Sequence, residues 1–248
     1  MLSKNLLKEI RILHIGKYRR KEQKFIAEGP KIVQEFLDSQ YEVDSIYATA
    51  DWMSANQLAH DNMVQITEKE LQAISLLKTP NQVLAIVNYP MTNEIQFENG
   101  DLIIALDTIQ DPGNLGTIIR IADWFGIRKI VCSVETADAF NPKVVQASMG
   151  ALTRVQMIYT NLEQWLKSLD KKTTIYGTML NGENIYESEL KHDGVIVIGN
   201  EGQGISSEIQ QLITSQIKIP AYSDSLMESL NAAVATAIVC AEFRRRKP

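Results

Sequence analysis

Apolar residues recur along the chain in two patterns, short continuous runs and longer stretches with helical spacing. Short runs of Val, Ile, Leu and Ala are typical of strands that are buried in a parallel sheet. Between these runs, apolar residues spaced three and four positions apart predict amphipathic helices. Because such strands and helices alternate over most of the chain, we expect an α/β fold with a mostly parallel sheet and helices on both faces.

The pattern also predicts where the chain divides. Before residue 90 it predicts helices at 3–15, 30–38 and 67–76 and strands at 24–27, 43–48 and 83–88. After residue 100 it predicts strands at 102–107, 129–134, 154–158, 174–179, 195–199 and 216–219, and helices at 115–125, 142–150, 161–169, 206–213 and 229–243. The stretch between Pro90 and Gly100 is polar and rich in turn-forming residues. We therefore expect two domains, residues 1–92 and 93–248.

Composition excludes several classes of protein. With 45% hydrophobic and 22% charged residues, the chain of 248 residues has the make-up of an ordinary globular protein. It has no run of about 18 apolar residues, so no membrane-spanning helix is expected, and its first residues lack the apolar core of a signal peptide. The two cysteines and three histidines give neither a disulfide framework nor a metal-ligand spacing. We expect a cytoplasmic protein without a bound metal.

The net charge of −5 hides an uneven distribution. Residues 1–35 contain nine Lys and Arg residues against four Glu residues, a local charge of +5. Their densest cluster has four cations, Lys17, Arg19, Arg20 and Lys21, around Tyr18, an aromatic side chain that can stack on a base. This cluster is either an RNA-binding surface or a solvated face without a ligand.

The most informative polar segment follows the strand at 102–107. Here Asp111-Pro112-Gly113-Asn114 leads into the next helix, where Asn114 is suited to cap the helix N-terminus. Arg120 lies about two turns further, off the apolar face. A strand end, a glycine-containing loop and a helix start are where open α/β sheets build ligand sites. Alternatively, Asn114 is only a cap and Arg120 only pairs with Asp123 on the surface.

Two later segments have similar character. Gly199-Asn200-Glu201-Gly202-Gln203-Gly204 follows the strand at 195–199, but its glycine order is not that of a dinucleotide-binding loop. Glu201 suits a cationic or uncharged ligand better than a pyrophosphate. The third segment joins Ile219-Pro220 to Ser229-Leu230-Asn231, before an alanine-rich helix that we expect to be buried in a core or an interface.

Together, the three segments resemble the signature motifs of the SpoU (TrmH-like) RNA 2′-O-ribose methyltransferases of the SPOUT superfamily. The family's Asn-x-Gly-x-x-x-Arg is matched by Asn114, Gly116 and Arg120, its Asn-Glu-Gly-x-Gly by Asn200–Gly204, and its Ile-Pro and Ser-Leu-Asn by Ile219-Pro220 and Ser229-Leu230-Asn231. The residues before the polar stretch more weakly resemble the family's ribosomal-protein-like substrate-binding domain, including the Glu28-Gly29 step before a helix.

The resemblance implies a C-terminal domain with a deep trefoil knot, a homodimer with the last helix at its interface, S-adenosylmethionine as cofactor, and RNA as substrate. It implies five catalytic residues, Arg120, Asn114, Glu201, Ser229 and Asn231. Glu201 would orient Arg120, Ser229 would cap the last helix, and the two asparagines would bind the ribose or order the loops. The implied cofactor contacts are Thr178, Gly199, Asn200, Ile219 and Leu230.

The chemistry limits what Arg120 can do. A ribose 2′-hydroxyl is a poor nucleophile, so the site has to orient it and assist loss of its proton. A guanidinium stays protonated, so we expect Arg120 to bind a phosphate and stabilise the forming alkoxide. The favoured function is methylation of a ribose 2′-hydroxyl in structured ribosomal or transfer RNA. Methylation of a base nitrogen and a non-catalytic RNA-binding module are alternatives, and a nicotinamide oxidoreductase is a more distant one.

Overall fold

The computed structural model describes residues 2–56, 61–90, 100–222 and 227–245. Its contacts divide the chain into two compact units, Met1–Thr92 with Asp138–Thr153, and Asn93–Ala137 with Arg154–Pro248. The stretch Asp138–Thr153 therefore belongs by its contacts to the first unit, although it lies far along the sequence. Residues 91–99, most of the expected linker, lie outside the described residues.

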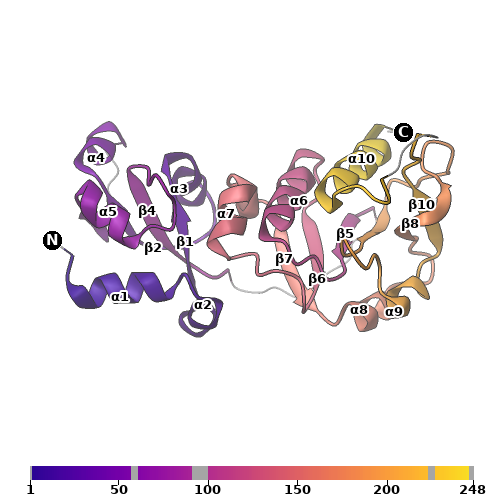
Figure 1. Cartoon of the computed structure of the whole chain (residues 1–248), viewed down its shortest axis with the longest axis horizontal. Coiled ribbons are helices and arrows are strands. Elements are labelled where there is room, and N and C mark those ends of the chain that lie inside the picture. The colour runs from indigo at the N-terminus through magenta and orange to yellow at the C-terminus, as the bar shows by residue number, and fades with distance from the viewer. Residues whose placement is uncertain (1, 57–60, 91–99, 223–226, 246–248) are drawn as a thin grey trace. The chain divides into compact units, whose positions relative to one another are not determined.

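The first unit is built on a four-stranded mixed sheet (Figure 1). Its strand order is β1 (Lys24–Glu28), β4 (Val83–Asn88), β2 (Val43–Ala48) and β3 (Met63–Gln65), with β4 antiparallel to both neighbours and β2 parallel to β3. Its helices are α1 (Lys4–Ile12), α2 (Gly16–Glu22), α3 (Pro30–Leu37), α4 (Ala50–Asn56), α5 (Glu68–Ile74) and α7 (Pro142–Ser148), and a 3₁₀ turn spans Ala151–Thr153.

Both faces of this sheet are covered, so β1 is buried along most of its length. Successive side chains of a strand point to opposite faces. Ile26 packs with residues of α1 and α5, including Ile10 and Leu71. Phe25 points the other way, where its ring lies 5.3 Å from Phe36 of α3 and 4.8 Å from Phe140, measured between ring centroids.

The helix predicted at 3–15 is shorter in the structure, and a second helix that the pattern did not predict follows it. α1 ends at Ile12, Ile15 adopts an extended conformation, and α2 begins at Gly16. The break is stabilised from within α2, because the Arg19 guanidinium donates to the carbonyl oxygens of Leu13 and His14. The last carbonyl groups of a helix have no partner inside it, and Arg19 supplies one just beyond the end of α1.

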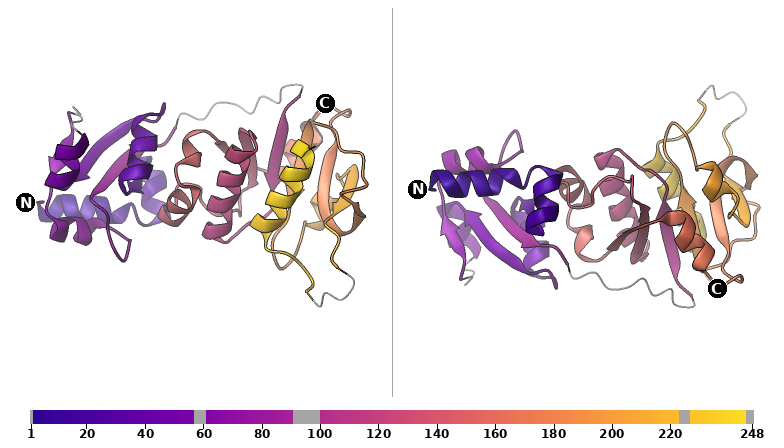
Figure 2. Two further views of the ribbon diagram at one scale, coloured as in Figure 1. Left: turned by 90° about the horizontal axis from the view of Figure 1, so that it is seen from above. Right: turned by 90° about the horizontal axis from the view of Figure 1, so that it is seen from below.

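The second unit contains a six-stranded sheet in which every neighbouring pair is parallel. The strand order is β10 (Ser215–Lys218), β8 (Ile175–Asn184), β9 (Gly194–Ile198), β5 (Leu102–Leu106), β6 (Lys129–Ser133) and β7 (Gln156–Thr160). Helices α6 (Pro112–Trp124) and α10 (Ala232–Arg245) lie on one face, and α8 (Leu162–Ser168) and α9 (Ser207–Gln210) on the other (Figures 1 and 2). The predicted α/β class with a mostly parallel sheet is confirmed.

The pairing of β5 with β9 places the two central motifs next to each other. These strands run in register from Leu102 opposite Gly194 to Leu106 opposite Ile198, and all ten residues are buried. Because neighbouring parallel strands have their carboxyl ends on the same side of the sheet, the loops that follow them start side by side. No helix in the described part of the chain is long and apolar enough to cross a membrane.

Candidate active site

The start of α6 differs from the prediction in a way that changes the role of Asn114. The helix begins at Pro112, and Asp111 is its N-cap, with the Asp111 carboxylate accepting the Asn114 backbone N–H at 2.7 Å. Proline suits the first helical position because its missing N–H is not needed there. The prediction that Asn114 caps the helix is therefore wrong, and its side chain bonds elsewhere.

The side chain of Asn114 joins the other two motifs. Its Nδ2 donates to Glu201 Oε1 at 2.5 Å, and its Oδ1 accepts a hydrogen bond from Asn231 Nδ2 at 2.9 Å. An ionised carboxylate only accepts hydrogen bonds, so Glu201 determines which way the Asn114 amide faces. That orientation in turn presents an oxygen to Asn231. One residue from each motif thus takes part in a single chain of hydrogen bonds.

Asn231 also fixes the start of α10. Its Oδ1 accepts the backbone N–H groups of Ala233 and Val234, at 3.0 and 3.2 Å. This is an N-cap, which satisfies donors that lack a partner in the first turn of a helix. Ser229, expected to cap this helix, lies two residues earlier and is exposed. The capping role expected for Ser229 therefore belongs to Asn231.

Arg120 is exposed and makes no hydrogen bond or ion pair within the described part of the chain. The alternative partner Asp123 is occupied, because Arg128 and Arg154 bind its two carboxylate oxygens. The expected contact with Glu201 is not formed in the described structure, where Glu201 bonds Asn114 instead. The guanidinium of Arg120 is thus available to a ligand.

The loop that carries Glu201 is closed on itself. The backbones of Asn200 and Gly204 pair in both directions, at 2.9 and 2.8 Å. A Cβ atom on Gly199 would lie 2.3 Å from the carbonyl carbon of Gly204, so the loop has no room for a side chain there. Gly204 has φ +72°, a conformation that glycine adopts without strain. Loop closure itself explains these two glycines.

The side chain of Asn200 belongs to this loop. Its Nδ2 donates to the Thr108 carbonyl at 2.8 Å, and its Oδ1 accepts the N–H groups of Gly202 and Gln203. An amide has one oxygen and two N–H donors, so most of its hydrogen-bonding capacity is used inside the protein. We therefore assign the Asn200 side chain to loop structure.

The remaining expected cofactor contacts come from β8 and from the segment between β10 and α10. Thr178 is in β8 and donates to the Val197 carbonyl of β9 at 3.0 Å. Ile219 follows the last residue of β10, and Leu230, 47% exposed, precedes α10. The described residues contain no cluster of His, Cys, Asp and Glu suited to a metal ion.

Sequence reasoning missed the residues that fasten these loops to the sheet. The carboxylate of Asp107, which is 5% exposed, accepts both the backbone N–H and the hydroxyl of Ser206 at 2.7 Å. Asp107 directly follows β5, and Ser206 precedes α9. An acidic residue at the end of an otherwise apolar strand was the signal, because a buried carboxylate requires hydrogen-bond partners.

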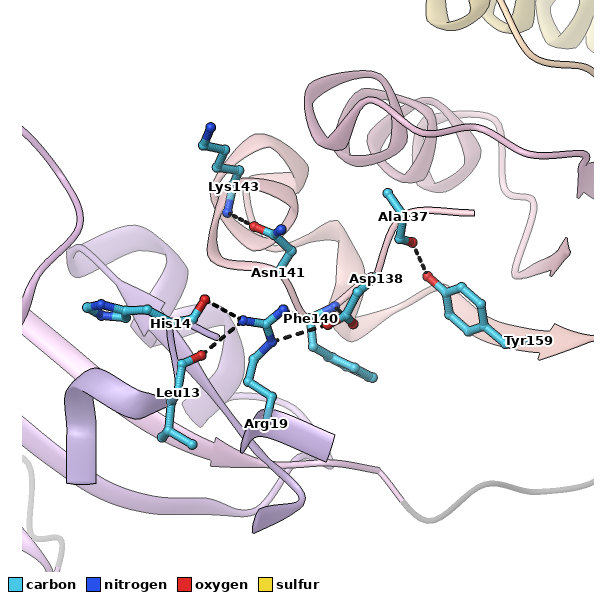
Figure 3. A network of polar contacts seen from close by, with 9 residues as sticks. All are labelled: Leu13, His14, Arg19, Ala137, Asp138, Phe140, Asn141, Lys143 and Tyr159. Carbon is cyan, nitrogen blue, oxygen red and sulfur yellow. Dashed lines mark hydrogen bonds and ion pairs between the residues drawn. The ribbon is translucent and has the colours of Figure 1, made fainter. Parts of the chain in front are cut away.

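In the first unit, the basic cluster has one buried member. Arg19 is 2% exposed, and its guanidinium binds Asp138 at 2.6 Å in addition to the carbonyl groups at the end of α1 (Figure 3). The other three cations, Lys17, Arg20 and Lys21, are exposed. An RNA-binding surface at this place therefore rests on those three side chains.

Comparisons with known proteins support the resemblance in both regions of the chain. The model of the SpoU rRNA Methylase family matches residues 101–241, and that of the MRM3-like substrate binding domain matches residues 4–85. The 23S rRNA (guanosine(2553)-2′-O)-methyltransferase RlmP of Bacillus subtilis is 31% identical over 241 residues, which cover 96% of this chain and 95% of that protein.

Two solved structures share the fold over the whole chain. A Porphyromonas gingivalis protein assigned to the TrmH family has a TM-score of 0.92 and 43% identity, and all of both chains is covered. An AdoMet-bound rRNA methyltransferase from Sinorhizobium meliloti has a TM-score of 0.87 and 29% identity, covering 99% of this chain and 96% of that one.

Proposed function

The chain belongs to the SpoU rRNA methylase family, and we propose that it transfers the methyl group of S-adenosylmethionine to a ribose 2′-hydroxyl of ribosomal RNA. The observation that carries this proposal is the hydrogen-bond chain from Glu201 through Asn114 to Asn231. It joins three motifs that lie far apart in sequence. The three motifs meet at the carboxyl ends of the strands, where open α/β folds bind ligands.

The same side of the sheet suits the cofactor. We propose that Thr178, Gly199, Ile219 and Leu230 line its site, with Asn200 shaping the loop between them. A half-exposed leucine offers an apolar surface to an adenine ring, and the carbonyl groups that follow buried strands are acceptors for its polar groups. When bound, S-adenosylmethionine supplies a methyl group on a positively charged sulfur, which keeps the bonding electrons as the ribose oxygen takes the methyl group.

Arg120 and Asn114 act on the nucleophile in this proposal. Arg120 has no intramolecular partner among the described residues, so its guanidinium can bind a phosphate of the RNA and stabilise negative charge on the 2′-oxygen. The hydroxyl proton leaves to water, because a guanidinium stays protonated. Asn114 and Asn231, held by Glu201, position the ribose and the loops around it. Ser229 is exposed beside them and is proposed as a further contact.

Ribosomal RNA is the proposed substrate because the full-length relative from Bacillus subtilis acts on 23S rRNA, and transfer RNA is the alternative. We propose that residues 1–92 bind the RNA, with residues 93–248 carrying the methyltransferase site. Lys17, Arg20 and Lys21 are exposed and would contact phosphates. A cytoplasmic location, where such RNA is found, is part of the proposal.

A homodimer is also proposed, together with the trefoil knot of the family. Trp124 at the end of α6 is 84% exposed, and Val234 on the neighbouring α10 is exposed as well. Large exposed apolar side chains on two adjacent helices are typical of an interface. A second copy of the chain would cover them and bring its own α10 beside the site.

The test is methyl transfer by the full-length protein. Purified protein is incubated with methyl-labelled S-adenosylmethionine and with ribosomal or transfer RNA from a strain that lacks the protein. The RNA is then digested to nucleosides. We expect label in a 2′-O-methylated nucleoside from ribosomal RNA. Label on a base would identify a base methyltransferase, and no label with retained RNA binding would identify a non-catalytic module.

A further inference from the structure

The residue that follows the end of β5 by two positions has an unusual backbone. Thr108 has φ +61°, in the left-handed region. A β-branched side chain at positive φ is a steric outlier, because its Cβ crowds the neighbouring backbone. Glycine or asparagine adopts this conformation at much lower cost. Such strain persists only where the surrounding structure enforces it, and it is concentrated at functional sites.

Three hydrogen bonds enforce the conformation of Thr108. Its N–H donates to Ser133 Oγ at 3.0 Å, at the end of β6, and its carbonyl accepts Asn200 Nδ2 at 2.8 Å, at the end of β9. Its hydroxyl donates to Asp107 Oδ1 at 3.1 Å. One strained residue thus ties together the carboxyl ends of three neighbouring strands.

Asp107 completes this connection. Its other carboxylate oxygen accepts the two hydrogen bonds from Ser206. The loop that carries Glu201 is therefore held at both ends from the end of β5, at Asn200 through the Thr108 carbonyl and at Ser206 through Asp107. Glu201 lies between these two points and meets Asn114, which belongs to the segment that continues from Thr108.

We propose that Asp107, Thr108 and Ser133 are positioning residues for methyl transfer. They hold the Glu201 loop in the position in which Glu201 orients Asn114. The strained backbone of Thr108 is tolerated because its hydrogen bonds fix that position. This inference rests on the proposed function and assigns the three residues a role that acts through the Glu201 loop, not through a contact with RNA or cofactor. Misplacement of reacting groups by about 1 Å costs roughly a hundredfold in rate, so a small shift of this loop is sufficient.

Two substitutions separate positioning from general stability. Asp107→Asn keeps the shape but leaves one acceptor oxygen, whereas the carboxylate accepts from Ser206 on one oxygen and from Thr108 on the other. Thr108→Gly relieves the strained φ and removes the hydroxyl bond, and it allows the turn to move. The control is Thr214→Val, because the Thr214 hydroxyl bonds Ile175 of β8 in the same unit, away from the motifs.

The first readout is structural and does not need activity. Hydrogen exchange of the Gly202 and Gln203 amides, which donate to Asn200, is measured in the full-length protein. We expect Asp107→Asn and Thr108→Gly to accelerate this exchange about tenfold or more, and Thr214→Val to leave it unchanged. Unchanged exchange in both site variants would overturn the inference.

The second readout is the single-turnover methylation rate at saturating cofactor and RNA, well below each variant's melting temperature. We expect both site variants to lose roughly tenfold to a hundredfold, and Asp107→Asn to add little to Glu201→Gln in the double variant. Wild-type rates in both variants, or additive losses in the double variant, would overturn this inference alone. An inactive wild-type protein would overturn the proposed function as well.

Discussion

Asn231 donates its side-chain amide to Asn114 at 2.9 Å, although 117 residues separate the two in sequence. Because Asn231 also caps α10, this contact couples the start of that helix to the first turn of α6. Glu201 orients the Asn114 amide, and the first N–H groups of α10 orient the Asn231 amide. The importance of the Asn114–Glu201 contact can be measured by exchanging its donor and its acceptor.

Asn114→Asp places a second carboxylate against Glu201. We expect the free energy of unfolding to fall by about 1 kcal/mol and methyl transfer to fall with it. In the double variant Asn114→Asp/Glu201→Gln, the amide introduced in place of Glu201 can donate to the new carboxylate, so the lost stability should return. Chemical denaturation of the two variants beside wild type gives the answer. Equal stability of Asn114→Asp and wild type would show that the contact is absent in solution.

Removal of the three exposed cations of α2 should weaken RNA binding. The triple variant Lys17→Ala/Arg20→Ala/Lys21→Ala makes fewer contacts with phosphates, so fewer counterions are released when RNA binds. The slope of log affinity against log salt should become less steep by up to about 0.9 for each contact that is lost. The matched control is Lys171→Ala/Lys172→Ala, which removes two cations of the second unit. Filter binding at several salt concentrations measures the slope. Equal slopes for the two sets would identify the α2 cluster as a solvated face.

Glu28 should make stability depend on pH. Burial raises the pKa of its carboxyl above the ordinary value of 4.5, and the Ser75 hydroxyl and the Leu76 N–H donate to it. A raised pKa in the folded state means that its contribution to stability is present below the unfolded pKa and is lost as pH rises through the folded one. Glu28→Gln removes this titration.

The free energy of unfolding of Glu28→Gln, relative to wild type, should therefore increase as pH rises from about 4.5 and level off above the folded pKa. Urea denaturation of both proteins across this range measures the difference. A difference that stays constant with pH would mean that Glu28 is as solvated in the folded protein as in the unfolded chain.

Trp124 tests the proposed homodimer. Trp124→Lys places a charge on an exposed apolar position at the end of α6, so we expect a monomer by sedimentation with little change in melting temperature. The control Val134→Lys changes another exposed apolar residue, directly after β6. A dimer that survives Trp124→Lys, or is lost equally in the control, would place the interface elsewhere.

Much of the fold follows from the apolar pattern, because long buried strands and amphipathic helices carry strong periodicity. The elements that the pattern did not predict, α2, α4 and β3, have only seven, seven and three residues. The two helices also carry few apolar residues at helical spacing, in contrast to the seven-residue helices α5 and α8, which the pattern predicted. Their conformation is set by contacts with the rest of the unit.

The candidate site was only partly predictable for a related reason. The motif residues were found by resemblance, but their partners depend on contacts between distant segments. Arg19 looked like a surface cation because its partner Asp138 lies 119 residues away. Asp111 before Pro112 was a readable helix start, whereas the Glu201 contact of Asn114 could be seen only in three dimensions.

Arg120 is the residue on which the proposed chemistry depends most. It is exposed, so Arg120→Ala opens no cavity, and we expect its melting temperature and cofactor affinity to stay close to those of wild type. Arg120→Lys should also be inactive, since an ammonium cannot reproduce the planar fork of a guanidinium. Arg128→Ala is the control, because Arg128 is an exposed arginine of the same unit that pairs with Asp123.

The decisive measurement is the single-turnover methylation rate of Arg120→Ala on its RNA substrate. A role in stabilising the forming alkoxide predicts a loss of roughly a hundredfold or more, with Arg128→Ala at the wild-type rate. A near wild-type rate in Arg120→Ala would contradict the assigned role of Arg120 and move the site of methyl transfer away from α6.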